Sequence, residues 1–266
     1  MKFYAGKLLV IILIVSCNIL PSCDKKEDDT DSPVTNQTKL NRTLLQEALE
    51  MGVEYIKNCQ KEEGNFVYEY DWTTQYNNPD DNEVRQAGAL WGLSLIFNHT
   101  KDTALLPYLQ KGFTFFENNA SEDGTKKWTV YPGKSSGKTG TVALLTLAHI
   151  EVLRTDATLE ASFKSELETS LAKYIQFLVA LKKDNGLFYG SYSFETGDGY
   201  GSSSPYADGE SLLALTKAAK YLNYTDLVST ILDSAKANYT VNVVEALDID
   251  PDSDTTKGFY QWGSMS

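Results

Sequence analysis

Two kinds of helical segment alternate along the chain from about residue 43 onward. One kind has a single apolar stripe at spacings of three and four, which leaves the opposite face of the helix in water. The other kind is apolar on nearly every side and rich in small residues, so it must be covered all round. This alternation is expected when an inner ring of helices packs against an outer ring. The pattern predicts an all-α fold, a partial (α/α) toroid of helical hairpins.

The ends of the predicted helices follow from the same pattern. The inner, all-apolar helices are expected to begin near Glu83, Lys138, Tyr206 and Lys257. The outer, striped helices are expected to end near Gln60 and to cover 103–119, 159–182 and 226–239. Each outer helix is followed by a loop that carries aromatic and acidic residues. These loops should gather at one mouth of the ring.

Three short motifs carry a resemblance to known proteins. They are Gln60-x-x-x-Gly64-x-Phe66, Asp123-Gly124 with Trp128, and Asn185-Gly186 with Phe188. The first resembles the Gln-x-x-x-Gly-x-Trp motif of α/α-toroid proteins, and the other two are similar to degenerate copies of it. Over the whole domain the pattern is similar to the six-hairpin glycosidase-like and terpenoid-cyclase-like superfamilies. Such toroids host hydrolases, lyases, epimerases, cyclases and binding subunits, so the resemblance implies the fold more than a reaction.

The N-terminus has the features of a secretory signal. Lys2 and Lys7 precede the apolar run 8–20, which is shorter than the roughly 18 to 20 residues of a membrane-spanning helix. The run ends in Leu-Pro-Ser-Cys, which resembles a bacterial lipobox with Cys23 as the lipidated residue. An ordinary cleaved signal with an incidental cysteine is the alternative. The acidic run 24–29 resembles the surface-export signal of Bacteroidota lipoproteins, and it also reads as a solvated tether.

These features predict three parts: a lipoprotein signal peptide (1–22), a disordered acidic linker (23–40) and the toroid domain (41–266). The expected location is the surface of a bacterial outer membrane, with the lipid on Cys23 as the membrane contact. Loss of residues 1–22 removes two lysines and no acid, so the net charge changes from −12 to −14. This charge argues against nucleic acids and anionic lipid surfaces as partners.

The last ten residues, 257–266, read as the start of a fourth inner helix, which leaves a six-hairpin ring open. The sequence is therefore expected to be truncated at its C-terminus, with a natural half-toroid as the alternative. An open ring should expose the apolar flank formed by Leu227, Ile231 and 212–222 and cause self-association.

Two carboxyl groups are the candidate catalytic pair, because glycoside hydrolysis needs an acid and a base or nucleophile. Asp71 lies on the first loop and Glu210 at the opening of the third inner helix, each beside aromatic residues expected to raise its pKa. The alternative role of Glu210 is in helix N-terminal capping chemistry. Arg85 is disfavoured in the first turn of a helix, so it is expected either to pair with Glu83 or Asp81 or to hold a substrate carboxylate.

Aromatic and acidic residues in the loops could hold a sugar. Arg85 with a tyrosine such as Tyr70 would suit a uronate lyase or epimerase. The candidate substrate-binding residues are Trp72, Trp128, Tyr131, Tyr206 and Asp208. For Trp72, Trp128 and Tyr131 the alternative is that they plug the mouth, and Asp208 could instead cap its helix. No cofactor is expected, and neither His99 nor His149 has a second ligand that would make a metal site.

The sequence therefore predicts a surface-anchored, glycan-active lipoprotein, with hydrolase, lyase or epimerase chemistry left open. The alternative is a non-catalytic glycan-binding or scaffold lipoprotein.

Overall fold

The computed structural model describes residues 39–266. The predicted signal peptide, the lipobox with Cys23 and most of the predicted linker lie outside these residues. Two units divide the chain between Tyr55 and Ile56. The described part of the first unit consists mainly of helix α2 (Arg42–Cys59), where the Asn41 side chain caps the first turn by accepting from the Leu44 amide at 3.0 Å. In the described chain, no helix combines the length and the apolar character needed to cross a membrane.

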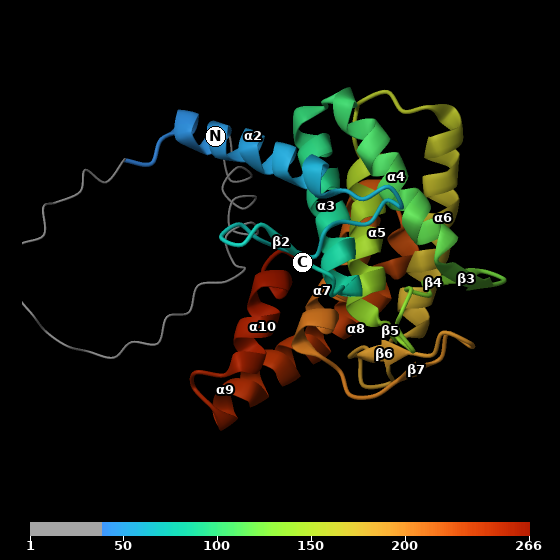
Figure 1. Cartoon of the computed structure of the whole chain (residues 1–266). Helices are drawn as coiled ribbons and strands as arrows, with labels where there is room; N and C mark the ends of the chain where they lie inside the picture. Colours follow the sequence, from blue (N-terminus) through green and yellow to red (C-terminus); the bar gives the residue numbers. More distant parts are fainter. Residues whose placement is uncertain (1–38) are drawn as a thin grey trace, which may run out of the picture. The chain divides into compact units, whose positions relative to one another are not determined.

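The second unit contains the inner helices that the sequence predicts (Figure 1). These are α3 (Glu83–Thr100), α5 (Thr139–Leu153), α7 (Pro205–Leu222) and α10 (Asp254–Gly263). Helix α5 packs between α3 and α7, and α7 also packs against α10. In α5 every residue from Thr139 to Val152 is buried, as a helix without a polar face requires. The predicted starting points are confirmed to within three residues.

The outer helices pack against the inner helix that precedes each of them. They are α4 (Leu106–Asn118), α6 (Ala161–Ala180) and α8 (Val228–Tyr239), and the 3₁₀ turns η1 (Thr103–Leu105) and η2 (Thr225–Leu227) lead into α4 and α8. Their apolar stripes face inward: in α4, Leu109, Phe113 and Phe116 are buried while Thr114 is exposed. The alternation of striped and all-apolar helices therefore corresponds to two layers.

The helix predicted to end at Tyr239 does not end there. The chain continues through a π-helical segment, η3 (Thr240–Glu245), into α9 (Ala246–Ile249). The cause lies in tertiary contacts, since Asn242 is buried and donates hydrogen bonds to Asn238 at 2.9 Å and to Asp208 of α7 at 3.3 Å. A π-helical turn places the Asn242 side chain against α7 in a way that the local sequence pattern does not reveal.

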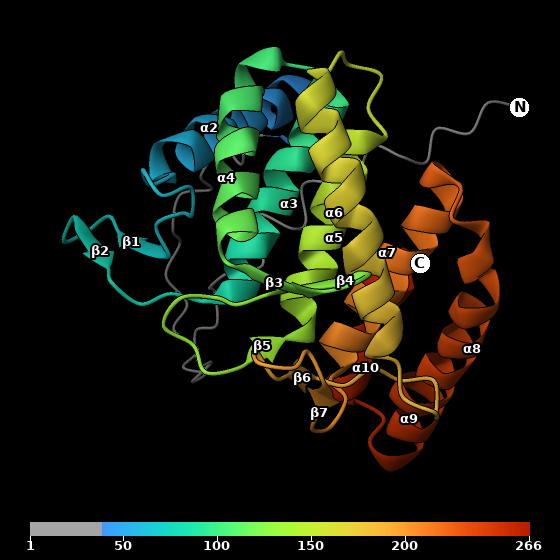
Figure 2. The same cartoon turned by 90° about the vertical axis from the view of Figure 1, so that its right-hand side faces the viewer.

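Short strands lie in the loops that enter the inner helices (Figure 2). They are β1 (Glu69–Asp71), β2 (Tyr76–Asn78), β3 (Ala120–Asp123), β4 (Lys126–Thr129), β5 (Gly137–Lys138), β6 (Ser191–Tyr192) and β7 (Gly199–Tyr200). Strands β1 and β2 form one antiparallel hairpin and β3 and β4 another. Strands β5, β6 and β7 form an antiparallel sheet that joins the loop before α5 to the loop before α7.

Two of the motif copies have the same local structure. Phe66 and Phe188 are both buried, each after a glycine with positive φ, and each pairs in an isolated bridge, with Gln60 and Lys182 respectively. The amide of Phe66 donates to Gln86 Oε1 at 2.7 Å, and the amide of Phe188 donates to Asp208 Oδ1 at 2.8 Å. A side chain in the first turn of an inner helix therefore holds the aromatic residue of the preceding loop. Both aromatic residues belong to the core.

We expect Gly64→Ala to destabilise the protein by about 2 kcal/mol or more. The φ of Gly64 is +110°, and a Cβ atom there would lie 2.3 Å from the carbonyl oxygen of Lys111. Gly124→Ala is the matched control, because Gly124 also has positive φ, +57°, but its Cβ would meet nothing within 4 Å. Urea unfolding measures both changes, and equal losses for the two variants would contradict the predicted clash.

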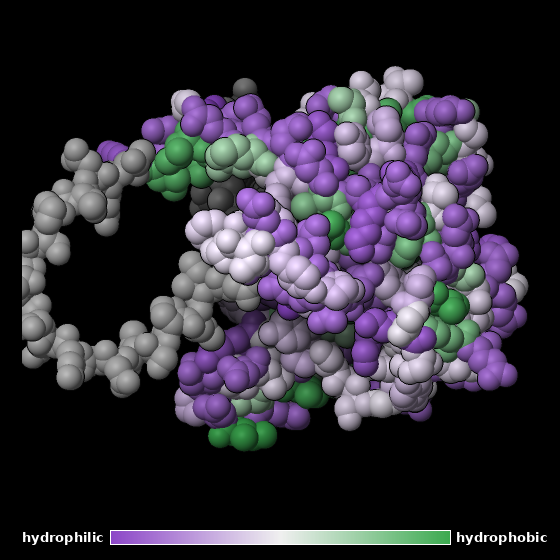
Figure 3. Space-filling model, in the orientation of Figure 1, coloured by the Kyte–Doolittle hydropathy of each residue, from purple (hydrophilic) through white to green (hydrophobic). Residues whose placement is uncertain are grey.

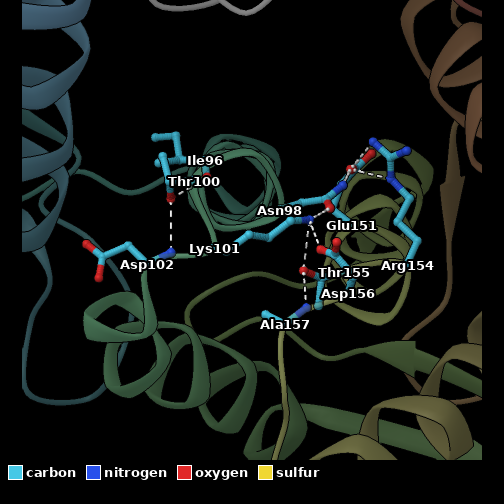
Figure 4. Close-up of polar contacts among 10 residues, drawn as sticks. All are labelled: Ile96, Asn98, Thr100, Lys101, Asp102, Glu151, Arg154, Thr155, Asp156 and Ala157. Atoms are coloured by element: carbon cyan, nitrogen blue, oxygen red, sulfur yellow. Dashed lines mark hydrogen bonds and ion pairs between the residues drawn. The ribbon is translucent and has the colours of Figure 1, made fainter.

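At the C-terminal ends of the inner helices, a buried carboxylate links three of them, and Figure 4 shows its contacts with Asn98 and Arg154. Glu151 of α5 accepts hydrogen bonds from Asn98 of α3 at 2.9 Å and from Lys217 of α7 at 2.6 Å. Arg154 also bonds the same carboxylate, with Nε at 2.7 Å and Nη2 at 2.6 Å. Cations are favoured at helix C-termini, so this network both neutralises Glu151 and ties α3, α5 and α7 together.

Candidate functional site

The first turns of α3, α5 and α7 meet at one end of the inner layer. A Cβ atom placed on Gly140 of α5 would lie 2.4 Å from Glu210 Oε2 of α7 and 3.6 Å from Val84 Cγ1 of α3. The Glu210 carboxyl group therefore occupies the space that a side chain at position 140 would fill. A larger residue at this position of α5 would displace the carboxyl group from where it lies.

Glu210 is a buried acid without a compensating partner. It is 4% exposed, and no hydrogen bond or ion pair of its carboxyl group is present in the described chain. Burial raises its pKa to about 8. Glu210 therefore keeps its proton at neutral pH, as a general acid must. The predicted rise in its pKa is confirmed.

A second buried acid, Glu83, opens α3. It is 5% exposed, and its Oε2 atom has no hydrogen-bond partner. Burial raises the pKa of Glu83 to about 7, and the charges of Lys138 and Lys134 lower it in part. Glu83 can gain or lose a proton near neutral pH, which suits proton transfer.

Asp71, Tyr70 and Trp72 lie instead on the exposed β1–β2 hairpin, which Figure 2 shows projecting from the helical layers of the second unit. Trp72 is 79% exposed. Hydrogen bonds from the side chains of Thr73 and Thr74 lower the pKa of Asp71 to about 2. The predicted rise in the pKa of Asp71 is therefore wrong, because its carboxylate sits in a solvated turn and the neighbouring aromatic residues do not cover it. The catalytic role of Asp71 and Tyr70 stays a prediction.

Arg85 pairs with neither of the expected carboxylates. Its Nη1 atom donates to the Tyr68 hydroxyl at 2.6 Å, and its guanidinium carbon lies 5.1 Å from the centre of the Tyr68 ring. The predicted ion pair is wrong because Glu83 turns into the core, while Asp81 Oδ2 accepts from Tyr131 and Asp81 Oδ1 from Gln86. The guanidinium remains exposed at the start of α3, so the prediction that it holds a substrate carboxylate stays open.

Three of the predicted substrate-binding residues are buried and hydrogen-bonded within the protein. Trp128 donates from its indole nitrogen to the Phe194 carbonyl at 3.0 Å. The Tyr131 hydroxyl donates to Asp81 Oδ2 at 2.7 Å. Asp208 accepts from the Phe188 amide and the Asn242 side chain, and burial raises its pKa to about 6. These contacts give all three residues a structural role, as the alternative interpretation expected for Trp128 and Tyr131. For Asp208 the expected helix cap is wrong: Ser204 is the N-cap residue of α7, and Asp208 instead bonds the preceding loop and Asn242.

Tyr206 is the fifth predicted substrate-binding residue and is 52% exposed. With Pro205, Asp254, Thr255 and Lys257 it lines an open cavity of about 580 Å³ between the first turns of α7 and α10. Of the five residues, Tyr206 and Trp72 alone present large aromatic surfaces to solvent. Their role in binding a ligand stays a prediction.

The sequence reasoning missed Glu83 as an acid in its own right and missed Gly140 entirely. Two features of the sequence could have indicated them. Glu83 is an acid at the first position of a largely apolar helix, and Gly140 is a glycine in the first turn of the most apolar helix. Within residues 39–266, no group of three or more His, Cys, Asp or Glu residues is arranged to hold a metal ion.

No protein-family model and no curated protein sequence matches the chain. Solved structures do. A D-mannose isomerase shares 16% identity with a TM-score of 0.60, over 76% of this chain and 52% of the isomerase. The chain has the α/α-toroid fold. Cellobiose 2-epimerase from Bacillus thermoamylovorans matches with 12% identity, a TM-score of 0.60, and 84% and 70% of the two chains.

A family 76 glycoside hydrolase, a mannosidase from Bacteroides thetaiotaomicron, matches with 12% identity and a TM-score of 0.55, over 74% of this chain and 53% of the hydrolase. This chain therefore spans about half the length of the isomerase and of the hydrolase. At these identities the comparisons show the fold, which is the fold that the motifs imply.

Proposed function

We propose that this chain is a carbohydrate-active protein that acts on a glycan at the first turns of α3, α5 and α7, with Glu210 as the proton donor. The observation that carries the proposal is the place of the Glu210 carboxyl group, which lies against Gly140 on a side chain that is 4% exposed and has no protein partner in the described chain. Burial raises its pKa to about 8, and strongly shifted pKa values are concentrated at functional sites. The toroid fold that the chain shares with sugar-processing enzymes supports the choice of substrate class.

Glu83 is the second group of the proposed site. Because its pKa is about 7, it can accept a proton in one step and return it in another. Hydrolases, lyases and epimerases each use one such group together with an acid. The two acids are therefore compatible with all three reaction classes, and the products of the reaction distinguish them.

The test is a screen of the purified protein against neutral and acidic oligosaccharides, with product analysis by mass spectrometry. We expect turnover of at least one glycan, and a loss of about 10²-fold or more in Glu210→Gln. Turnover that persists unchanged in Glu210→Gln would overturn the assignment of the acid.

A non-catalytic glycan-binding protein is the second candidate. It is favoured by the exposed aromatic side chains of Trp72 and Tyr206, because such surfaces can contact a sugar ring whether or not a reaction follows. Retention of a glycan without any product would support this candidate over the first.

We further propose that the protein is anchored to a bacterial outer membrane through a lipid on Cys23. The support is the sequence Leu-Pro-Ser-Cys after an apolar run. We expect Cys23→Ala to move the protein from the membrane pellet to the soluble fraction, with Cys59→Ala as the control that stays in the pellet. Retention of Cys23→Ala in the pellet would contradict the anchor.

Self-association is also proposed, through a surface other than the one first expected. Leu227 is buried, as are Leu212, Leu213 and Leu215 of α7, so most of the predicted flank is not exposed. The reason is that α8 covers this face of α7. Ile231 is half-buried, and Tyr221 at the end of α7 is 41% exposed.

The exposed stripe lies on the other face of α8 and consists of Val228, Leu232 and Tyr239, and Figure 3 shows further apolar surface over α9. Leu232 is 65% exposed. Light scattering should report a dimer or larger species that Leu232→Glu reduces. An unchanged monomer mass for both proteins would contradict self-association.

A further inference from the structure

Residues of α4, α6 and strand β4 line a groove on the outer wall of the toroid. Figure 2 shows where these three elements lie. Its volume is about 640 Å³, within the range of small-ligand sites. Phe113, Thr114 and Glu117 line it from α4, and Lys127 lines it from β4. None of the residues of the proposed catalytic site belongs to it. The groove is therefore a separate candidate site.

The charges in the groove disfavour an anionic ligand. Lys127 is 12% exposed and makes a close ion pair with Glu117, and its Nζ also donates to Ser170 Oγ at 3.1 Å. Glu122 lies 4.0 Å from the same Nζ, and the exposed Glu166 adds a negative charge at the rim. An anion would therefore meet two or three carboxylates and a cation that is already paired. A neutral ligand avoids both costs.

Hydroxyl groups surround an apolar floor in this groove. Phe113 and Phe163 form the floor, with ring centres 6.0 Å apart in an edge-to-face arrangement. The hydroxyl-bearing residues of the lining are Thr114, Ser162, Ser165, Thr169 and Ser170. In the described chain, Thr114 Oγ1 and Ser165 Oγ have no protein hydrogen-bond partner, and both residues are exposed. Neutral donors and acceptors around an apolar surface match a polyhydroxylated ring.

Two fully buried polar groups behind the groove lack partners. The imidazole of His149 lies 4.6 Å from the Phe113 ring, and the Tyr174 ring lies 6.0 Å from Lys127 Nζ. His149 Nδ1 bonds the Leu145 carbonyl at 2.8 Å, so Nδ1 carries the hydrogen, and burial lowers the pKa of His149 to about 4. His149 Nε2 is then an acceptor without a donor, and the Tyr174 hydroxyl is also unpaired. Neither residue lines the groove, so these two groups belong to the core behind its floor.

We propose that this groove binds a neutral saccharide of one or two rings, independently of any chemistry at Glu210. The floor of Phe113 and Phe163 would contact the apolar face of the sugar. The hydroxyl groups of Thr114 and Ser165 would bond its edge.

The proposal is tested by titrating the full chain with D-mannose and cellobiose while the backbone amide signals of Ser165 and Ser170 are followed by NMR. We expect saturable shifts with a dissociation constant on the order of 1 to 10 mM. Glucuronate should bind at least several-fold more weakly. Absence of saturable shifts with both neutral sugars would overturn the proposal, and so would equal or tighter binding of glucuronate.

Two substitutions on α6 locate the binding. Ser165 is exposed and lines the groove, so Ser165→Trp should fill it and weaken binding about tenfold or more without disturbing the core. Gln176→Trp adds the same side chain at an exposed position of α6 outside the lining and should bind like the unmodified protein. Unchanged affinity in Ser165→Trp would overturn the site. Glu210→Gln should leave these shifts unchanged, which separates this result from the fate of the proposed catalytic function.

Discussion

Replacing Glu210 with glutamine is expected to remove a large part of the loss of stability that the protein undergoes between about pH 4.5 and pH 8. In the unfolded chain this carboxyl group titrates near pH 4.5, whereas in the folded protein burial raises its pKa to about 8. Below pH 4.5 both states hold the proton, and between these values the folded state alone holds it. The contribution of Glu210 to the free energy of unfolding therefore falls as pH rises from about 4.5 and is fully lost above pH 8.

The size of this effect follows from the size of the shift. One pKa unit corresponds to roughly 1.4 kcal/mol, so a buried acid shifted this far accounts for several kcal/mol between pH 4.5 and pH 9. Glutamine has nearly the same shape and does not ionise. The difference in unfolding free energy between Glu210→Gln and the unmodified protein should therefore grow steadily with pH, as urea titrations at four pH values would measure.

Asp71→Asn is the matched control for this experiment. Hydrogen bonds from Thr73 and Thr74 lower the pKa of Asp71 to about 2, so this carboxylate is ionised in both states above pH 5. The Asp71→Asn variant should lose stability with pH just as the unmodified protein does. If Glu210→Gln also followed that curve, Glu210 would not be a buried protonated acid, and its assignment as the proton donor would fail.

The two layers could be predicted from the sequence because they depend on the periodicity of apolar residues alone. Helices α3, α5 and α7 have no polar face, and that property requires cover on every side wherever the helix sits. The continuation of α8 through η3 into α9 could not be predicted in this way. It depends on the buried contact between Asn242 and Asp208, two residues that are 34 positions apart in the sequence.

The candidate site could be predicted only in part, because the residues next to a side chain in the sequence do not determine whether it faces the core or the solvent. Asp71 and Glu210 both lie beside aromatic residues, yet one is exposed on a hairpin and the other is enclosed by α3 and α5. Likewise, Trp128 and Tyr131 belong to a loop but turn into the core. The acid at position 83 looked like a partner for Arg85, whereas burial of its side chain makes it a titratable group.

The network at the opposite end of the inner helices should have a comparable effect on stability. Glu151→Ala removes the carboxylate that Lys217, Arg154 and Asn98 share. The side chain of Lys217 is 17% exposed and that of Arg154 is 26% exposed, so two poorly solvated cations would lose their counter-charge. Breaking such a buried pair costs about 3 to 5 kcal/mol. Urea unfolding at neutral pH measures the loss.

Asp156→Ala is the control in the same region, because Figure 4 shows Asp156 on the Lys101 side of this network. Asp156 is 86% exposed and contacts Lys101 Nζ at 2.8 Å, a surface ion pair whose loss should be hardly measurable. Adding Lys217→Met to Glu151→Leu should recover part of the stability lost in Glu151→Leu alone, because one stranded charge is then removed. Equal losses of unfolding free energy in Glu151→Ala and Asp156→Ala would contradict this prediction. Such a result would mean that water solvates Lys217 and Arg154, and that Glu151 does not hold the three inner helices together.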